Sequence, residues 1–393
     1  MTEITYGVLR WRNRLDFVLA AHSTRPLTKI DDVPLTALRI GLYQLRFLNR
    51  VPERAAVDES VRLAHAFGAS WSASFVNAVL RKALRQPDAP RLPSKQDDPL
   101  GYLATTLSHP RWLARRYLDR LKIEDAEARC RCQNQPPPVH VRVSPPLSVE
   151  DARASLEADG VMSESVSLAP KALCIIGGEL RKSSLYREGR LCIQDAGAQL
   201  VTTLLDVSSG DVVIDVCSAP GGKATALAEQ AFDGYVLALD RRPRRTGLTR
   251  ALAMRLGRKN VLSVAADGTR LPVAGSFARI LVDVPCTSLG TLRRNPDIKW
   301  RVEEDDLTRH RALQRELLNA AAEKLAPGGR LVYATCSSEP EENQDVVNAF
   351  LADEPGFRLV PSPVLATREG FFETRPERDD TDAHFAAILT RDR

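Results

Sequence analysis

The chain has 393 residues, of which 44% are hydrophobic and 27% are charged, and its formal net charge is +5. This length exceeds that of one ordinary domain, and the composition is typical of folded proteins. No stretch approaches the roughly 20 consecutive apolar residues of a membrane span, and the first residues lack the pattern of a secretory signal, so we expect a cytoplasmic protein.

The charge is distributed unevenly along the chain. Residues 1–140 hold 22 Lys and Arg against 14 Asp and Glu, whereas residues 141–393 hold 33 against 36. This asymmetry favours a polyanion-binding module followed by a near-neutral catalytic body. Seven irregularly spaced cysteines are expected to be reduced thiols. Cys130 and Cys132 form the only close pair, and no further ligands stand near them, so we expect no metal.

Helical periodicity dominates the first part of the chain. Apolar residues recur every three or four positions over 35–48, 57–67 and 71–84, which predicts three amphipathic helices in an all-helical domain over residues 1–88. The segment 86–99 is rich in proline and polar residues, and a further basic helical region is expected at 110–131. We therefore assign residues 89–135 to a linker and helical region.

The pattern then changes to strands. Short alternating runs and a helical segment over 136–190 predict a small α+β unit. From residue 191 to the end, helices alternate with apolar strands at 212–216, 235–239, 261–265, 280–282 and 331–333. This alternation predicts an α/β domain, doubly wound around a mostly parallel sheet.

A glycine-containing turn follows the first of these strands. Asp215 opens the sequence Asp-Val-Cys-Ser-Ala-Pro-Gly-Gly-Lys-Ala-Thr, at the point where an open α/β sheet binds its ligand. A phosphate-binding loop would need Gly at 217 and Ser or Thr at 224, so an NTPase is disfavoured and another nucleotide-like cofactor is expected. The simpler alternative is a turn that only tightens the strand-to-helix connection.

Acidic residues end the next three strands. They are Asp240, Asp267 and Asp283. A carboxylate in the position of Asp240 can accept both hydroxyls of a ribose. Each acid alone is more often a helix cap or a turn residue. As a set, however, they line one edge of the sheet, which favours a cofactor site.

Two cysteines follow buried-looking strands. Cys286 comes after Leu281–Pro285, and Cys336 comes after Val332–Thr335. Because parallel strands end at the same edge of a sheet, these thiols can converge on one pocket, although a single cysteine at a strand end is more often a packing residue. Between them, the segment 292–300 carries three cations and a tryptophan. It is expected either to receive phosphates and a base or to be a solvated loop.

At these residues the sequence resembles the RNA 5-methylcytosine methyltransferases of the RsmB/Sun family, which act on 16S (small-subunit) ribosomal RNA. The resemblance covers nearly the whole chain. Residues 1–85, with Leu42-Tyr43, Val57–Val61 and Phe75–Leu80, are similar to the NusB-type helical domain that precedes the catalytic domain in that family.

The resemblance implies a Rossmann-like class I methyltransferase that uses S-adenosylmethionine. Cytosine carbon 5 is a weak nucleophile, so a thiolate must first add to carbon 6. In the family pattern Cys336 is the nucleophile, Cys286 assists product release, and Asp283 also touches the cytosine. The implied partner is RNA, without a membrane or a metal, and we expect a monomer. The implied cofactor-binding residues are Cys217, Ser218, Ala219, Pro220, Gly221, Gly222, Lys223, Asp240, Asp267 and Asp283.

The sequence departs from the family pattern at three places. Compared with the family, the helical domain is expected to begin late, with its first helix shortened or lost. The family segment Ser-Ala-Gln after Gln194-Asp195 is here Gly197-Ala198-Gln199, and the usual Asp-Gly-Phe near the C-terminus is Asp382-Ala383-His384-Phe385. These changes leave open the same chemistry on tRNA or on large-subunit (23S) RNA.

Two other classes of function also remain open. One is a DNA or protein methyltransferase on the same fold, since the fold alone does not fix the acceptor. The other is a non-catalytic RNA-binding module, which the presence of both cysteines disfavours.

Overall fold

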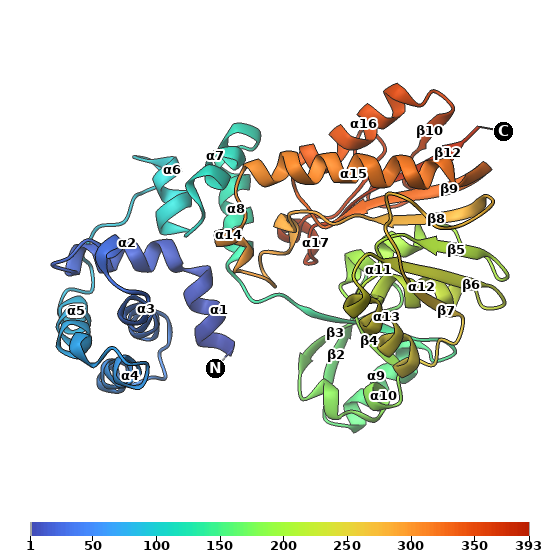
Figure 1. Cartoon of the computed structure of the whole chain (residues 1–393). Helices are drawn as coiled ribbons and strands as arrows, with labels where there is room; N and C mark the ends of the chain where they lie inside the picture. Colours follow the sequence, from blue (N-terminus) through green and yellow to red (C-terminus); the bar gives the residue numbers. More distant parts are fainter. Residues whose placement is uncertain (1, 393) are drawn as a thin grey trace. The chain divides into compact units, whose positions relative to one another are not determined.

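The computed structural model describes residues 2–392, which form two compact units. The helical unit comprises residues 2–135 together with Leu292–Arg301. The catalytic unit comprises Pro136–Thr291 and the chain from Val302 onwards. Figure 1 shows the elements of each unit.

The helical unit is built around α3, α4 and α5, which confirm the three predicted amphipathic helices. Leu38 and Leu42 of α3 are fully buried, with Val76 and Leu80 of α5 in the same core. Two further helices precede them at the start of the domain. The first of them has only nine residues, and in the second Arg12 and Arg14 interrupt the apolar spacing on which periodicity relies. The bounds are α1 Thr2–Arg10, α2 Arg12–His22, α3 Asp32–Phe47, α4 Glu53–Ala66 and α5 Ala73–Arg85.

The rest of the helical unit consists of shorter elements. The basic helical region expected at 110–131 consists of two helices, because Leu121 and Lys122 adopt extended backbone between them. Residues 292–301, which come from between two strands of the catalytic unit, add a last short helix here. The bounds are α6 Pro99–Gly101, α7 Arg111–Arg120, α8 Ile123–Gln133 and α14 Ile298–Arg301, with short turns at Leu27–Lys29, Ser70–Ser72 and Tyr102–Thr106.

The catalytic unit begins with a small antiparallel sheet in the order β2-β3-β1-β4. Apolar residues of β1, β3 and β4 pack against α9 on one face of this sheet. On the other face, Arg142 of β1 forms a buried ion pair with Glu229, with Nε and Oε2 3.2 Å apart. The elements are β1 Val139–Val143, α9 Val149–Ala158, β2 Met162–Ser165, β3 Ala172–Gly177, a turn at Leu180–Lys182, α10 Ser184–Arg187 and β4 Leu191–Ile193.

A large sheet in the order β10-β12-β9-β8-β5-β6-β7 forms the centre of the catalytic unit. The pairs among β5 to β9 are parallel, and the pairs made by β12 are antiparallel. This confirms the predicted doubly wound, mostly parallel α/β fold. The strands are β5 Val212–Asp215, β6 Tyr235–Asp240, β7 Val261–Ala265, β8 Phe277–Asp283, β9 Leu325–Thr335, β10 Phe357–Val360, β11 Phe372–Glu373 and β12 Phe385–Arg391.

Helices cover both faces of this sheet (Figure 1). On one face α11 and α12 pack on apolar side chains of β5, β6, β8 and β9, and α15 and α16 pack on the other face. Because alternate residues of a buried strand supply the two cores, the strands read as continuous apolar runs. No helix in residues 2–392 is long and apolar enough to cross a bilayer. The helices are α11 Ala196–Thr203, α12 Gly222–Gln230, α13 Pro243–Arg255, α15 Asp305–Glu323, α16 Gln344–Asp353 and α17 Pro376–Asp379, with short turns at Leu289–Thr291 and Pro340–Glu342.

Candidate active site

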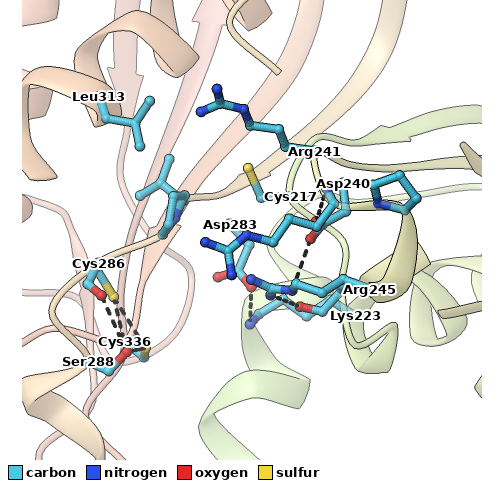
Figure 2. A pocket seen from close by; sticks show the side chains of 15 residues that line it. Cys217, Lys223, Asp240, Arg241, Arg245, Asp283, Cys286, Ser288, Leu313 and Cys336 are labelled. Carbon is cyan, nitrogen blue, oxygen red and sulfur yellow. Dashed lines mark hydrogen bonds and ion pairs between the residues drawn. The ribbon is translucent and has the colours of Figure 1, made fainter. Parts of the chain in front are cut away.

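A cavity of about 820 Å³ opens at the carboxyl ends of β5, β6, β8 and β9. Figure 2 shows the thiols of Cys286 and Cys336 on one side of it and the charged groups of Lys223, Asp240 and Asp283 on the other. This is the sheet edge where the sequence predicted a cofactor and two thiols. The lining residues are Cys217, Ala219, Lys223, Asp240, Arg241, Arg242, Pro243, Arg245, Asp283, Val284, Pro285, Cys286, Ser288, Leu313 and Cys336.

The turn between β5 and α12 supplies the floor of the cavity. Gly221 has φ +104°, a left-handed conformation that lets the chain enter α12, and a Cβ there would stand 2.9 Å from the Thr249 Cα. The backbone N–H of Ser218 donates to Leu239 O at 2.7 Å, which fixes the turn against β6. The Ser218 hydroxyl is buried, with no hydrogen-bond partner among the described residues.

Asp240, at the end of β6, and Asp283, at the end of β8, both line the cavity. Asp240 accepts from the Arg242 N–H at 3.0 Å, and its Oδ2 lies 3.4 Å from Arg245 Nε. Asp283 accepts from Lys223 Nζ at 2.7 Å. Burial alone lowers the pKa of Lys223, but the charge of Asp283 and this hydrogen bond outweigh burial, so the pKa is raised. Lys223 is therefore a cation paired with Asp283.

Asp267 differs from the other acids. It is exposed, it accepts from the N–H and hydroxyl of Thr269, and it is absent from the cavity lining. Its position at the end of β7 follows the sequence pattern. The structure nevertheless does not bring it into the same wall as Asp240 and Asp283.

Asp215 lies buried beneath the cavity at the end of β5. It is fully buried, and neither carboxylate oxygen has a hydrogen-bond partner among the described residues. Burial, then the nearby charge of Asp283, raises the pKa of Asp215 to about 8. This carboxyl group is therefore mostly protonated at neutral pH.

Cys286 and Cys336 face each other with their sulfur atoms 3.3 Å apart. The loop that carries Cys286 is anchored by the buried Glu342, which accepts from the Thr287 N–H at 2.8 Å. Cys336 follows β9 directly, and its carbonyl accepts from the Gly290 N–H at 3.0 Å. Backbone contacts of both loops therefore fix the spacing of the two thiols.

The two thiols differ in acidity. Hydrogen bonding from Cys286, with a further contribution from the Ser288 hydroxyl at 3.4 Å, outweighs burial and lowers the pKa of Cys336 to about 7. Hydrogen bonding to Cys336, together with burial, raises the pKa of Cys286 well above its usual value. Cys336 is therefore the thiolate of the pair, and Cys286 is its proton-bearing neighbour.

Several cavity residues were not singled out from the sequence. Arg241, Arg242 and Arg245 line the cavity, and only their position directly after Asp240 could have indicated them. Ser288, with φ +60°, is another, and its only signal is its place two residues after Cys286. These side chains reach the cavity only through the folding of the chain, so the sequence pattern gives little indication of them.

The cationic segment 292–300 was expected either to receive phosphates and a base or to be solvated. Instead it belongs to the helical unit, where Lys299 is 1% exposed and donates to Asn134 Oδ1 at 2.5 Å. The Arg293 carbonyl accepts from Arg10, and the Trp300 indole N–H donates to Leu9 O. Arg293 is also buried, so this segment contributes to the packing of the helical unit.

The site fits a nucleoside-type cofactor such as S-adenosylmethionine. The cavity volume lies in the range of small-molecule sites. The cavity wall combines the carboxylates of Asp240 and Asp283 with the cationic Lys223, groups that can bind the polar parts of such a cofactor. Asp240 stands where a carboxylate binds ribose hydroxyls.

Comparisons with known proteins agree with this geometry. Residues 202–390 match the family described as 16S rRNA methyltransferase RsmB/F, residues 1–85 match the NusB family, and residues 109–178 match the ferredoxin-like domain of RsmF/B-like methyltransferases. The cofactor expected from the sequence, S-adenosylmethionine, is confirmed by this family membership.

Several relatives match all or nearly all of the chain. The probable ribosomal RNA small subunit methyltransferase B of Bacillus subtilis is 34% identical, over 100% of this chain and 90% of that protein. The ribosomal RNA small subunit methyltransferase B of Pseudomonas putida is 35% identical, over 94% and 83%. The crystal structure of PH0851 has a TM-score of 0.87 at 29% identity and covers 99% of this chain and 89% of that one. The chain therefore belongs to the RsmB/F family of S-adenosylmethionine-dependent ribosomal RNA methyltransferases, as the sequence motifs predicted.

Proposed function

We propose that this protein methylates carbon 5 of a cytosine in 16S ribosomal RNA, through a covalent bond between Cys336 and carbon 6 of the base. The observation that carries the proposal is the pair of thiols 3.3 Å apart on the wall of the cavity that also holds Asp240 and Asp283. A methyltransferase that acts on a more nucleophilic atom needs no such pair.

The cofactor and the base have distinct places in this proposal. S-adenosylmethionine supplies the methyl group. The turn Cys217–Lys223, together with Asp240 and Asp283, forms its binding site, and Asp240 accepts hydrogen bonds from the ribose. Of the turn, Cys217, Ala219 and Lys223 line the cavity, whereas Asp267, which completes the family pattern, is exposed and lies outside the lining. Asp283, fixed by Lys223, also contacts the edge of the cytosine.

The first chemical step uses the acidity of Cys336. Because its pKa is about 7, a large fraction is thiolate near neutral pH. The thiolate adds to carbon 6, and the electrons of the 5,6 double bond then make carbon 5 nucleophilic toward the methyl group. Reaching carbon 6 requires an unstacked, flipped-out cytosine.

The second step restores the ring and frees the enzyme. A base removes the proton from carbon 5, the 5,6 double bond re-forms, and the Cys336 thiolate leaves. We assign Cys286 as that base. The hydrogen bond to Cys336 and the charge of its thiolate are among the causes that raise the pKa of Cys286. Once Cys336 is bonded to carbon 6, both causes are removed, so Cys286 can lose its proton to water and accept the one from carbon 5.

The RNA partner accounts for the excess of positive charge in residues 1–140. We propose that the helical unit, which matches the NusB family, binds the ribosomal RNA. Transfer RNA and large-subunit RNA are the competing substrates for the same chemistry. Methyl transfer to each of the three RNAs distinguishes these substrates.

The test is transfer of labelled methyl from S-adenosylmethionine to protein-free small-subunit RNA, large-subunit RNA and tRNA, with bisulfite mapping of the product. We expect label at one cytosine of small-subunit RNA, no label with Cys336→Ala, and a denaturation-resistant protein–RNA adduct with Cys286→Ala. Cys174→Ala, in β3 of the small sheet, is the matched control and should behave as wild type. Undiminished methylation by Cys336→Ala would refute the covalent route, and label only on another RNA would overturn the substrate.

A further inference from the structure

His384 lies beside Cys336 on the same face of the large sheet. Strand β12 runs antiparallel to β9, and Phe385 pairs with Thr335. The residue before Phe385 and the residue after Thr335 are therefore neighbours at the end of the ladder, and they point to the same face. Ala386, two positions after His384, packs in the core under α11 and α12. The imidazole is 5% exposed.

The ring of His384 is held by a buried carboxylate. Its Nε2 lies 3.2 Å from Oδ1 of Asp195, the N-cap residue of α11. The Gly197 N–H donates to the same oxygen at 3.0 Å, and the Thr381 hydroxyl also donates to it. Burial alone raises the pKa of Asp195, but hydrogen bonds from His140 and His384 outweigh burial and hold it well below its usual value. Asp195 is therefore a carboxylate that fixes His384.

Gly197 provides the space that this ring occupies. A Cβ at Gly197 would stand 2.6 Å from Cδ2 of His384, a distance that real Cβ atoms do not tolerate. The family pattern has Ser at the position of Gly197, and the His384 segment is the other place where the catalytic unit departs from that pattern. Gly197 and His384, where the catalytic unit departs from the family pattern, are therefore in contact with each other.

Few groups around Cys336 favour its thiolate through their charge. Asp283 opposes the thiolate, and the nearby cation Lys223 is paired with Asp283 at 2.7 Å. Cys286 and Ser288 contribute hydrogen bonds without a positive charge. An electrostatic interaction with His384 also lowers the pKa of Cys336. His384 directly precedes β12, the strand next to β9, and lies on the face of the sheet opposite the core of α15 and α16.

We propose that His384 is a positioning residue that stabilises the thiolate of Cys336 from the neighbouring strand, that Asp195 fixes its ring, and that Gly197 makes room for it. The inference rests on the proposed role of Cys336 as the nucleophile. It adds an electrostatic partner that the usual family motifs do not contain.

The test measures the acidity of Cys336 directly, without RNA or cofactor. The full-length protein is alkylated with iodoacetamide between pH 5.5 and 9.5, and the fraction of modified Cys336 peptide is followed by mass spectrometry. We expect His384→Gln to raise the midpoint by roughly one pH unit and to slow alkylation at pH 7 about fivefold. Gly197→Ser, which displaces the ring, should shift the midpoint in the same direction.

His140→Gln is the matched control, because His140 meets the other oxygen of the same carboxylate, with Nδ1 3.4 Å from Asp195 Oδ2. It should leave the midpoint unchanged. An unchanged midpoint in both His384→Gln and Gly197→Ser, or an equal shift in His140→Gln, would overturn the inference. The pH profile of kcat should shift with the alkylation midpoint. If Cys336→Ala still methylates RNA, the nucleophile assignment fails, whereas the alkylation midpoint reports on His384 in either case.

Discussion

The buried Lys299 gives the helical unit a pH-dependent stability that one substitution should remove. Its ammonium donates to Asn134 Oδ1, to Ser108 O at 3.3 Å and to Arg10 O at 3.4 Å. Burial lowers the pKa of Lys299 from 10.5 to about 7. In the unfolded chain the amine keeps its ordinary pKa, so between about pH 7 and pH 10.5 the unfolded state binds a proton that the folded state has lost.

The magnitude follows from this difference. The pKa of Lys299 differs by about 3.5 between the unfolded and folded states, which corresponds to about 5 kcal/mol. The free energy of unfolding of the helical unit should therefore rise by about 1.4 kcal/mol per pH unit within that window. Below about pH 7 this gain is absent. In Lys299→Met the titrating group is gone, so its contribution to the slope should vanish. The same variant loses three hydrogen bonds, and the prediction therefore concerns the slope and not the stability at one pH.

Tryptophan fluorescence reports this unit selectively, because all four tryptophans, at positions 11, 71, 112 and 300, belong to it. Urea unfolding followed by this signal at pH 7 and pH 9.5 should show the wild type gaining about 3 kcal/mol more than Lys299→Met between the two pH values. Lys29→Met, an exposed lysine of the same unit, should keep the wild-type slope. Equal slopes in wild type and Lys299→Met would refute the reasoning.

Three further outcomes concern the catalytic unit. Asp240→Asn should weaken S-adenosylmethionine binding roughly tenfold to a hundredfold in calorimetry, because a charged acceptor is lost, whereas Asp267→Asn should change it much less. Arg142→Met leaves Glu229 buried without its main partner and should destabilise the unit by about 3–5 kcal/mol in circular-dichroism unfolding, with a milder loss in Arg142→Met/Glu229→Gln. Because the pKa of Asp215 is raised to about 8, the folded state holds a proton that the unfolded state releases above about pH 4, so stability should fall as the pH rises from about 4 to about 8. Asp215→Asn should lack that fall in thermal melts, and a parallel fall in both proteins would contradict it.

The fold of the catalytic unit could be predicted because its signals are local. Continuous apolar strands alternate with helices, and each strand keeps its polar or thiol group at the carboxyl end, so parallel pairing alone brings Cys286 and Cys336 together. The turn at Gly221 is likewise a local feature of neighbouring residues. The apolar pattern of the strands and the residues that directly follow them were therefore sufficient to predict the centre of the site.

The features that could not be predicted depend on distant partners. Lysine and arginine are rarely buried, so the segment around Lys299 suggested a solvated or phosphate-binding loop, and its partner Asn134 is 165 positions away. His384 meets Asp195 across 189 positions. The first two helices were missed for a different reason, since α1 has only nine residues and the arginines of α2 disrupt the apolar spacing on which the prediction relied.

The insertion of residues 292–301 into the helical unit has a consequence for synthesis. The chain leaves this unit after residue 135 and returns to it only at Leu292. On the ribosome, the N-terminal helices therefore emerge long before the segment that carries Lys299 and Trp300, whose partners Asn134 and Leu9 are made 165 and 291 residues earlier. The domain that is made first is completed only after most of the catalytic unit has been made.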